Sequence, residues 1–215
     1  MSKKTALLVW GGWEGHEPGK CADIVEGILI AEGYSVAKRN TTEAFADSDL
    51  TSLHLIVPIF SMGNILPHES RCLCAAIESG VGLAGFHGGM GDSFRLDTDY
   101  QFMTGGQFVA HPGNSILYRV NIVDRNDPIM NGVQDFDYVS EQYYMHVDPA
   151  NHVLATTTFS GEHCAWTKGV VMPVVWKRRH GSGKVFYSSL GHVAAEFKIP
   201  EMSMIFRRGM LWASA

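Results

Sequence analysis

The 215-residue chain lacks several features that would assign it to a specialised class. Its four cysteines form no C-x-x-C pair, and Cys72 and Cys74 are too close for an ordinary disulfide or a structural zinc knuckle. The net charge of −5 offers no basic stripe, which argues against nucleic acid as a partner. No hydrophobic run is long enough for a membrane span or a signal peptide. We expect a cytoplasmic protein with reduced thiols and no membrane partner.

The composition is that of an ordinary soluble globular protein, with 46% apolar and 18% charged residues. No low-complexity stretch, internal repeat or linker divides the chain. A length near 200 residues suits one domain with a large core, so we expect a single domain over residues 1–215.

The first half of the chain alternates short apolar runs with amphipathic segments. We predict strands at residues 5–10, 34–38, 53–60 and 81–86, and helices at 19–32 and 67–80. Strand-helix-strand repetition at this spacing implies right-handed crossovers and a doubly wound, mainly parallel sheet.

The second half changes character and looks mostly extended. We predict strands at residues 116–123, 139–147, 153–159, 170–176 and 184–189, with a hairpin tip at 178–183. A final helix begins at Pro200. The predicted class is therefore α/β, with antiparallel strands added in the C-terminal half.

A strand-to-helix turn around His87 carries the clearest functional signal. The run Val81–Phe86 ends at His87 and is followed directly by Gly88 and Gly89. This is the outline of a nucleophile elbow, in which small neighbours let the chain turn sharply, but histidine stands where serine or cysteine would. The alternative is a glycine-rich turn that happens to contain a histidine.

Three histidines follow apolar strands beside a glycine: His16, His87 and His192. In a parallel sheet such positions meet at the carboxyl edge, where open α/β sheets bind ligands. Two further segments are dense in site-type residues, Gly105–Gly113 with His111, and Ser140–Pro149 with Glu141. We expect His16, His87, His111, Glu141 and His192 to surround one pocket. The remaining histidines are assigned to structure or surface: His54, His68, His152, His163 and His180.

A series of short motifs in order along the chain resembles the ThuA-like (trehalose utilisation) family, a branch of the class I glutamine amidotransferase-like superfamily. The motifs are Gly15-His16, Gly85-Phe86-His87, Gly105-Gly106-Gln107-Phe108 with His111-Pro112, Glu141-Gln142-Tyr143, Pro173-Val174-Val175-Trp176, Gly183-Lys184-Val185-Phe186-Tyr187 and Leu190-Gly191-His192. The resemblance covers nearly the whole chain and implies a flavodoxin-like arrangement of the sheet.

The wider superfamily has a cysteine at the elbow and a late histidine with a glutamate two residues further on. Here His87 replaces the cysteine and residue 194 is alanine, so the nearest glutamate is Glu196. Without an elbow thiol no thioester with glutamine forms, and we expect no glutaminase activity.

The resemblance implies a role in the catabolism of trehalose or a related disaccharide, alongside a sugar 3-dehydrogenase that makes 3-keto sugars. A 3-keto group acidifies the C2 proton, so a base and an acid could cleave the glycosidic bond by elimination. We assign Glu141 or His87 as base and His192 as acid, with His16, His111 and His146 as ligands of a divalent metal (zinc or manganese) or of sugar hydroxyls. No nucleotide cofactor is expected.

Three aromatic residues are candidates for the apolar face on which a sugar stacks: Trp13, Tyr143 and Trp176. Aromatic residues in strands are more often core, so that alternative stands beside the stacking role. Two other functions also remain open, a non-catalytic sugar-binding or regulatory module and a ketosugar isomerase or epimerase. The sequence leaves homo-oligomer formation open too.

Overall fold

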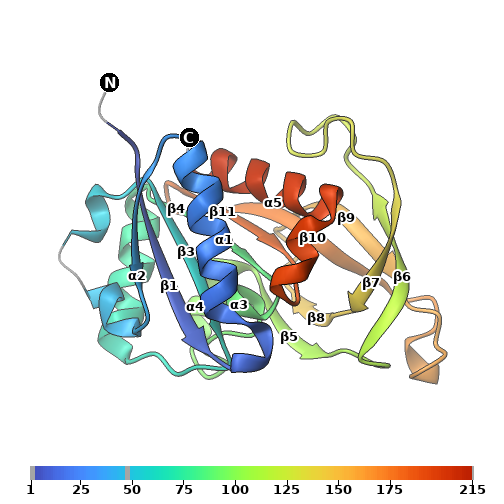
Figure 1. The fold of residues 1–215 in the computed structure, drawn as a ribbon. Coiled ribbons are helices and arrows are strands. Elements are labelled where there is room, and N and C mark those ends of the chain that lie inside the picture. The colour runs from blue at the N-terminus through green and yellow to red at the C-terminus, as the bar shows by residue number, and fades with distance from the viewer. Residues whose placement is uncertain (1–2, 47–48, 215) are drawn as a thin grey trace.

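A nine-stranded sheet forms the centre of the protein, with strand order β2-β1-β3-β4-β11-β10-β9-β6-β7 (Figure 1). The computed structural model describes residues 3–46 and 49–214; residues 1–2, 47–48 and 215 of the predicted domain lie outside it. The parallel half consists of β2 (Ser35–Arg39), β1 (Thr5–Gly12), β3 (Leu55–Ser61), β4 (Gly82–Phe86) and β11 (Gly183–Ser188).

The other half of the sheet is antiparallel. It consists of β10 (Val171–His180), β9 (His152–Thr158), β6 (Ser115–Ile122) and β7 (Phe136–Glu141). A separate two-stranded sheet pairs β5 (Gly106–Ala110) with β8 (Tyr144–Val147). The prediction of an α/β fold with a parallel sheet and added antiparallel strands is confirmed.

Helices cover both faces of the parallel half (Figure 1). On one face lie α1 (Pro18–Ala31) and α5 (Pro200–Ala213); on the other lie α2 (Pro67–Ser79), the short α3 (His87–Gly91) and α4 (Thr98–Thr104). Single 3-10 turns occur at Glu14–His16, Thr42–Ala46, Leu50–Ser52, Ala165–Thr167 and Ala194–Lys198. Helices α1, α2 and α5 each begin at a proline, which needs no amide partner in the first turn.

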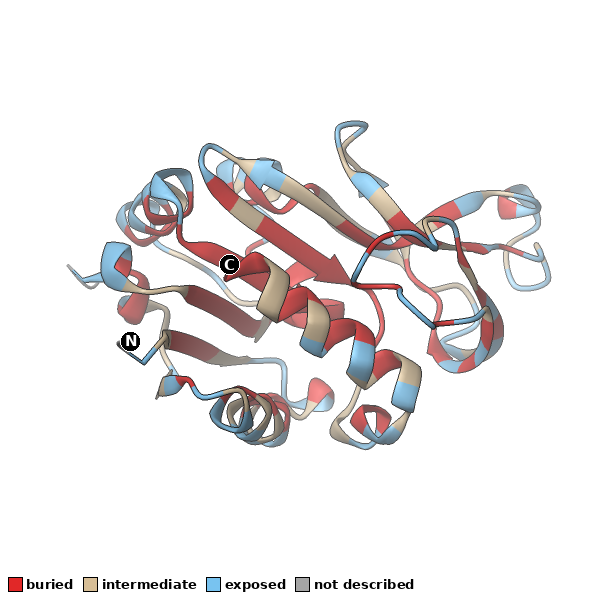
Figure 2. Cartoon of the chain, turned by 90° about the horizontal axis from the view of Figure 1, so that it is seen from above, coloured by how far each residue is buried: buried red, intermediate tan, exposed pale blue. Residues whose placement is uncertain are grey.

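The inner strands β1, β3, β4 and β11 are buried on both faces over most of their length, whereas no residue of the edge strand β2 is fully buried (Figure 2). One core lies under α1 and α5, and the other under α2, α3 and α4. Continuous apolar runs such as β3 and β4 follow from this double burial. Among the described residues, no helix is both long enough and apolar enough to cross a membrane.

The antiparallel half curls back toward the carboxyl edge of the parallel half. Strand β7 is five places from β4 in the sheet order. A flat sheet would place them about 24 Å apart, since neighbouring strands lie about 4.8 Å apart. Yet Glu141, the last residue of β7, contacts His87, the residue that follows β4.

The predicted strand at 139–147 is two strands, not one. Strand β7 ends at Glu141 and β8 starts at Tyr144, and the two belong to different sheets. Between them Gln142 is buried, and its side-chain amide donates a hydrogen bond to Thr157 Oγ1 at 2.8 Å. This break between β7 and β8 determines which side chains of β8 point toward the core and which point toward solvent.

Trp176 on β10 belongs to the core under α2, α3 and α4, and its replacement tests the packing of that core. Its indole N–H donates to the Thr104 carbonyl oxygen at 3.0 Å, and its ring packs on Tyr187. Trp176→Phe leaves that buried carbonyl unpartnered and opens a cavity, so we expect a loss of about 2–4 kcal/mol in the free energy of unfolding. Urea denaturation measures this. Sugar binding by the folded variant should be unchanged, and a selective loss of sugar binding would contradict the core assignment.

Candidate functional site

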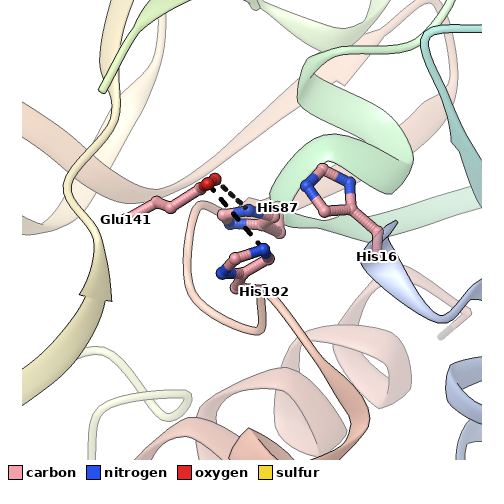
Figure 3. A group of neighbouring side chains, drawn as sticks. All are labelled: His16, His87, Glu141 and His192. Carbon is pink, nitrogen blue, oxygen red and sulfur yellow. Dashed lines mark hydrogen bonds and ion pairs between the residues drawn. The ribbon is translucent and has the colours of Figure 1, made fainter. Parts of the chain in front are cut away.

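Four side chains from distant parts of the chain converge at the carboxyl edge of the parallel strands (Figure 3). His16 follows β1, His87 follows β4, His192 follows β11, and Glu141 ends β7. One nitrogen or oxygen atom from each lies within 4.8 Å of the others. The position matches the ligand-binding edge of open α/β sheets.

His87 occupies a strained turn. Its φ of 45° is left-handed, a region that residues other than glycine seldom adopt, and α3 starts at this residue. The turn lifts the imidazole above the end of β4, as the nucleophile-elbow pattern predicts. Gly88 is required for a different reason, because a Cβ there would lie 2.4 Å from His16 Cε1 and 2.9 Å from Ser61 Oγ.

The tautomer of His87 follows from its partners. Nδ1 lies 2.8 Å from the Ser189 carbonyl oxygen, which only accepts, so Nδ1 carries a proton and donates it. Nε2 then faces Glu141 Oε2 at 3.1 Å. A bare imidazole lone pair and a carboxylate repel each other, so this contact requires a proton or a metal cation at Nε2.

His16 is fixed in a similar way. Its Nδ1 is hydrogen-bonded to Ser61 Oγ at 2.6 Å, and Ser61 is the last residue of β3. Its ring lies edge-on to His87 and His192, with centroids 4.8 and 5.1 Å away. A histidine that binds a metal usually donates its other ring N–H to a protein oxygen, and both His16 and His87 have such an oxygen at Nδ1.

His192 lies on the loop after β11, stacked on the His87 ring at 5.1 Å. Its Nε2 is 3.8 Å from Glu141 Oε1. His111, just after β5, approaches the same oxygen at 3.7 Å through its own Nε2. The side chains of His192 and His111 are 20% and 32% exposed, against 1% for His87, so solvent and ligands reach the cluster from their side.

The charges of the cluster are strongly coupled. Burial alone would raise the pKa of Glu141, but the contact with His87 and the charges of His87, His192 and His111 lower this pKa to about 2. Burial, with the neighbouring His87 and His192, lowers the pKa of His16 to about 3. Burial and His87 also lower the pKa of His192. Near neutral pH the site therefore contains an ionised carboxylate and neutral His16, a donor set suited to a divalent cation.

The types of side chain in the cluster are suited to binding a divalent metal ion. Three imidazoles and one carboxylate are common ligands of zinc and manganese. A small cavity of about 10 Å³ among His16, Ser61, His87 and His192 is the size of one water molecule. A sugar does not fit in this cavity and would have to lie over the exposed edge of the cluster.

The structure brings together His16, His87, His111, Glu141 and His192, the group expected to share a pocket. Trp13 lies beside them, with its ring 4.7 Å from that of His16 and 48% of its surface exposed. It is the expected stacking residue whose face remains accessible.

Three other expected roles do not fit the positions found. Trp176 is 1% exposed in the core, and Tyr143 is buried between the rings of His87 and Phe108, at 4.1 and 4.5 Å. Neither presents a face to a sugar. His146 is exposed on β8 because Met145, its neighbour, points inward, and it lines a separate surface pocket with Gln107 and Phe102. It is not one of the clustered ligands.

None of the histidines assigned to structure or surface is a member of the cluster. His54 is hydrogen-bonded to Thr5, His152 pairs with Asp124, His180 lies 3.3 Å from Glu78, and His68 and His163 are exposed. A second set of possible metal ligands consists of Asp124, Asp127 and His152. In this set Asp127 already forms an ion pair with Lys177.

Sequence reasoning overlooked Ser61 and Ser189, which hold His16 and His87 in place, and noted Glu196 only as the glutamate nearest to His192. Ser61 carried a usable signal, because it directly follows the predicted strand 53–60 as His87 follows the predicted strand 81–86. Glu196 does not contact an imidazole. Its carboxylate instead accepts backbone N–H bonds from Gly191 and His192.

A family model described as trehalose utilisation matches residues 5–213. The chain belongs to the ThuA family. No curated protein sequence matches it. Among solved structures, a ThuA-like protein from Parabacteroides merdae aligns with a TM-score of 0.77 at 16% identity, over 100% of this chain and 91% of its own. A ThuA-like protein from Bacteroides uniformis aligns at 0.77 and 17% identity, over 98% and 91%.

A third similar structure is a cold-adapted β-galactosidase from Rahnella sp. R3. It aligns with a TM-score of 0.59 at 17% identity, covering 95% of this chain but 32% of the β-galactosidase. The same fold therefore forms one part of a longer carbohydrate-active enzyme.

Gly88→Ala tests the close packing of the cluster. The new Cβ displaces the His16 imidazole and Ser61, so we expect affinity for Zn²⁺ or Mn²⁺ to fall about tenfold or more. Titration calorimetry measures the affinity, and thermal unfolding reports a stability cost of about 1–3 kcal/mol. Gly27→Ala in α1 is the matched control, since its Cβ meets no atom within 4 Å. Equal metal affinity in both variants would contradict the packing argument.

Proposed function

We propose that this ThuA-family protein acts on a 3-keto glycoside or related ketosugar by acid/base chemistry at a divalent-metal centre. The family description, trehalose utilisation, supports the carbohydrate context. The parallel strands run in the order β2-β1-β3-β4-β11, the 2-1-3-4-5 order of flavodoxin-like sheets, which supports the proposed relation to the class I amidotransferase-like superfamily.

The proposal rests on the position of the Glu141 carboxylate among three imidazoles. Glu141 Oε2 faces His87 Nε2, whose ring is fixed by Ser189, while Oε1 faces both His111 and His192. A carboxylate placed among imidazoles, without a serine or cysteine nucleophile at the elbow, suits proton transfer rather than covalent catalysis.

His16, His87 and one carboxylate oxygen of Glu141 would hold the metal, with His111 completing the set, so that the other Glu141 oxygen and His192 remain for proton transfer. A bound divalent cation would supply a positive charge that stabilises the enediolate of a ketosugar. Because the Nδ1 atoms of His16 and His87 are hydrogen-bonded to Ser61 and Ser189, their Nε2 atoms remain for binding the metal. Trp13 would offer its exposed face to the sugar ring.

Of the two candidate bases, Glu141 is the more accessible, with a side chain 10% exposed against 1% for His87. We assign Glu141 to remove the C2 proton beside the C3 ketone. The C–H electron pair passes into the C3 carbonyl to give an enediolate, which then restores the ketone and forms the C1–C2 double bond as the bond from C1 to the leaving oxygen breaks. His192, beside Glu141 and partly exposed, donates the proton that this oxygen needs. Addition of water to the double bond would complete a net hydrolysis.

The 3-keto substrate has to be made by an oxidising enzyme, so a sugar 3-dehydrogenase is the proposed functional partner. All four cysteines are free thiols, which supports the proposed cytoplasmic location.

Alanine variants of His87 and His192 test the reaction. We expect each to lower turnover of 3-keto-trehalose by roughly two to four orders of magnitude, because each loses a group that transfers or orients a proton. Chelation should also lower turnover, and added Mn²⁺ or Zn²⁺ should restore it. His152→Ala, an exposed histidine outside the cluster, is the control and should keep full activity.

Two alternatives give different outcomes in the same assay. No turnover by the wild-type protein on any 3-keto glycoside tried, with or without added Mn²⁺ or Zn²⁺, would favour a sugar-binding module. The β-galactosidase match supports that alternative, because there the fold is part of a longer chain. A product that is a rearranged ketosugar rather than a cleaved one would identify an isomerase or epimerase.

The elbow residue predicts a second, negative result. With His87 in place of a thiol, the protein should release no ammonia from glutamine. A coupled glutamate dehydrogenase assay measures this. Release at about one per second or faster, an ordinary enzymatic rate, would contradict the prediction.

A further inference from the structure

Glu196 lies next to the cluster without belonging to it. It sits in the 3-10 turn Ala194–Lys198 that follows the loop of His192, and its side chain is buried. A buried carboxylate is costly unless hydrogen-bond donors surround it, so its partners show what it holds in place.

The donors come from two separate parts of the fold. The backbone N–H groups of Gly191 and His192 donate to Oε2 at 3.2 and 2.9 Å. The hydroxyl of Tyr138 also donates to Oε2, and that of Ser140 donates to Oε1 at 2.8 Å. All four donors are neutral groups. The first pair belongs to the loop after β11 and the second pair to β7.

These two elements carry two members of the cluster. His192 is itself one of the donors, and Ser140 immediately precedes Glu141 on β7. Tyr138 strengthens the link, because its hydroxyl oxygen also accepts from Gly191 N at 3.1 Å. One carboxylate thus ties the loop of His192 to the strand of Glu141.

We propose that Glu196 is a positioning residue that sets the separation between His192 and Glu141, and thereby the metal affinity of the cluster. The inference rests on the proposed metal centre. In the sheet order, β7 and β11 are four places apart, so no direct ladder fixes their ends relative to each other. The Glu196 hydrogen bonds supply that constraint at the site. Outer residues that orient metal ligands typically affect affinity by about 10–100-fold.

The test compares Zn²⁺ and Mn²⁺ affinities of graded variants by titration calorimetry. E196A removes both links and should weaken binding by about 10–100-fold. E196Q should be intermediate, since its amide oxygen still accepts from His192 N while its NH₂ group donates to Ser140. The double variant Y138F/S140A keeps the loop contacts of Glu196 but releases β7, and should weaken binding by about tenfold.

Tyr34→Phe is the structural control. It removes the buried hydroxyl pair between Tyr34 and Ser214, far from the site in the fold, and should lower thermal stability without changing metal affinity. If E196A does not fold, Y138F/S140A decides the matter. Affinities of the folded variants within threefold of wild type would overturn the positioning role. Wild-type protein that binds neither metal would overturn the proposed metal centre itself, and with it this inference.

Discussion

The contact between the imidazole of His87 and the carboxylate of Glu141 joins the two halves of the sheet. His87 stands at the end of the parallel half, and Glu141 ends the outermost antiparallel strand. Both groups are largely buried, so each depends on the other for electrostatic compensation. The curl of the antiparallel half, the left-handed turn at His87 and the hydrogen bond to Ser189 all serve to bring these two groups within 3.1 Å.

The rest of the site is arranged around that pair. His16 approaches from β1 only because residue 88 is glycine, and His192 approaches from β11 on a loop held by Glu196. His111 and Trp13 lie on the open side. The arrangement separates two tasks, since buried groups hold the geometry and partly exposed groups face the ligand.

Much of the parallel half and its histidines could be predicted from sequence, because apolar strands ending in glycine and histidine mark the carboxyl edge of such a sheet. The roles of Tyr143, His146 and Trp176 could not. The chain breaks between β7 and β8 at Gln142, and this break decides that Met145 points inward and His146 outward. Trp176 shows the ordinary outcome for an aromatic residue on a central strand, which is burial. Glu196 was visible as a nearby acid, but the sequence does not show that its carboxylate faces backbone amides.

The pairing of β4 with β11 has a consequence for how the site comes into being. His87 and its hydrogen-bond acceptor Ser189 are 102 positions apart in the chain, so the tautomer of His87 is fixed only after a very long loop has closed. Closure of this kind is entropically unfavourable and slows folding. The ligand cluster is thus a product of the completed topology, and a bound ion would stabilise the finished fold by mass action rather than guide the chain toward it.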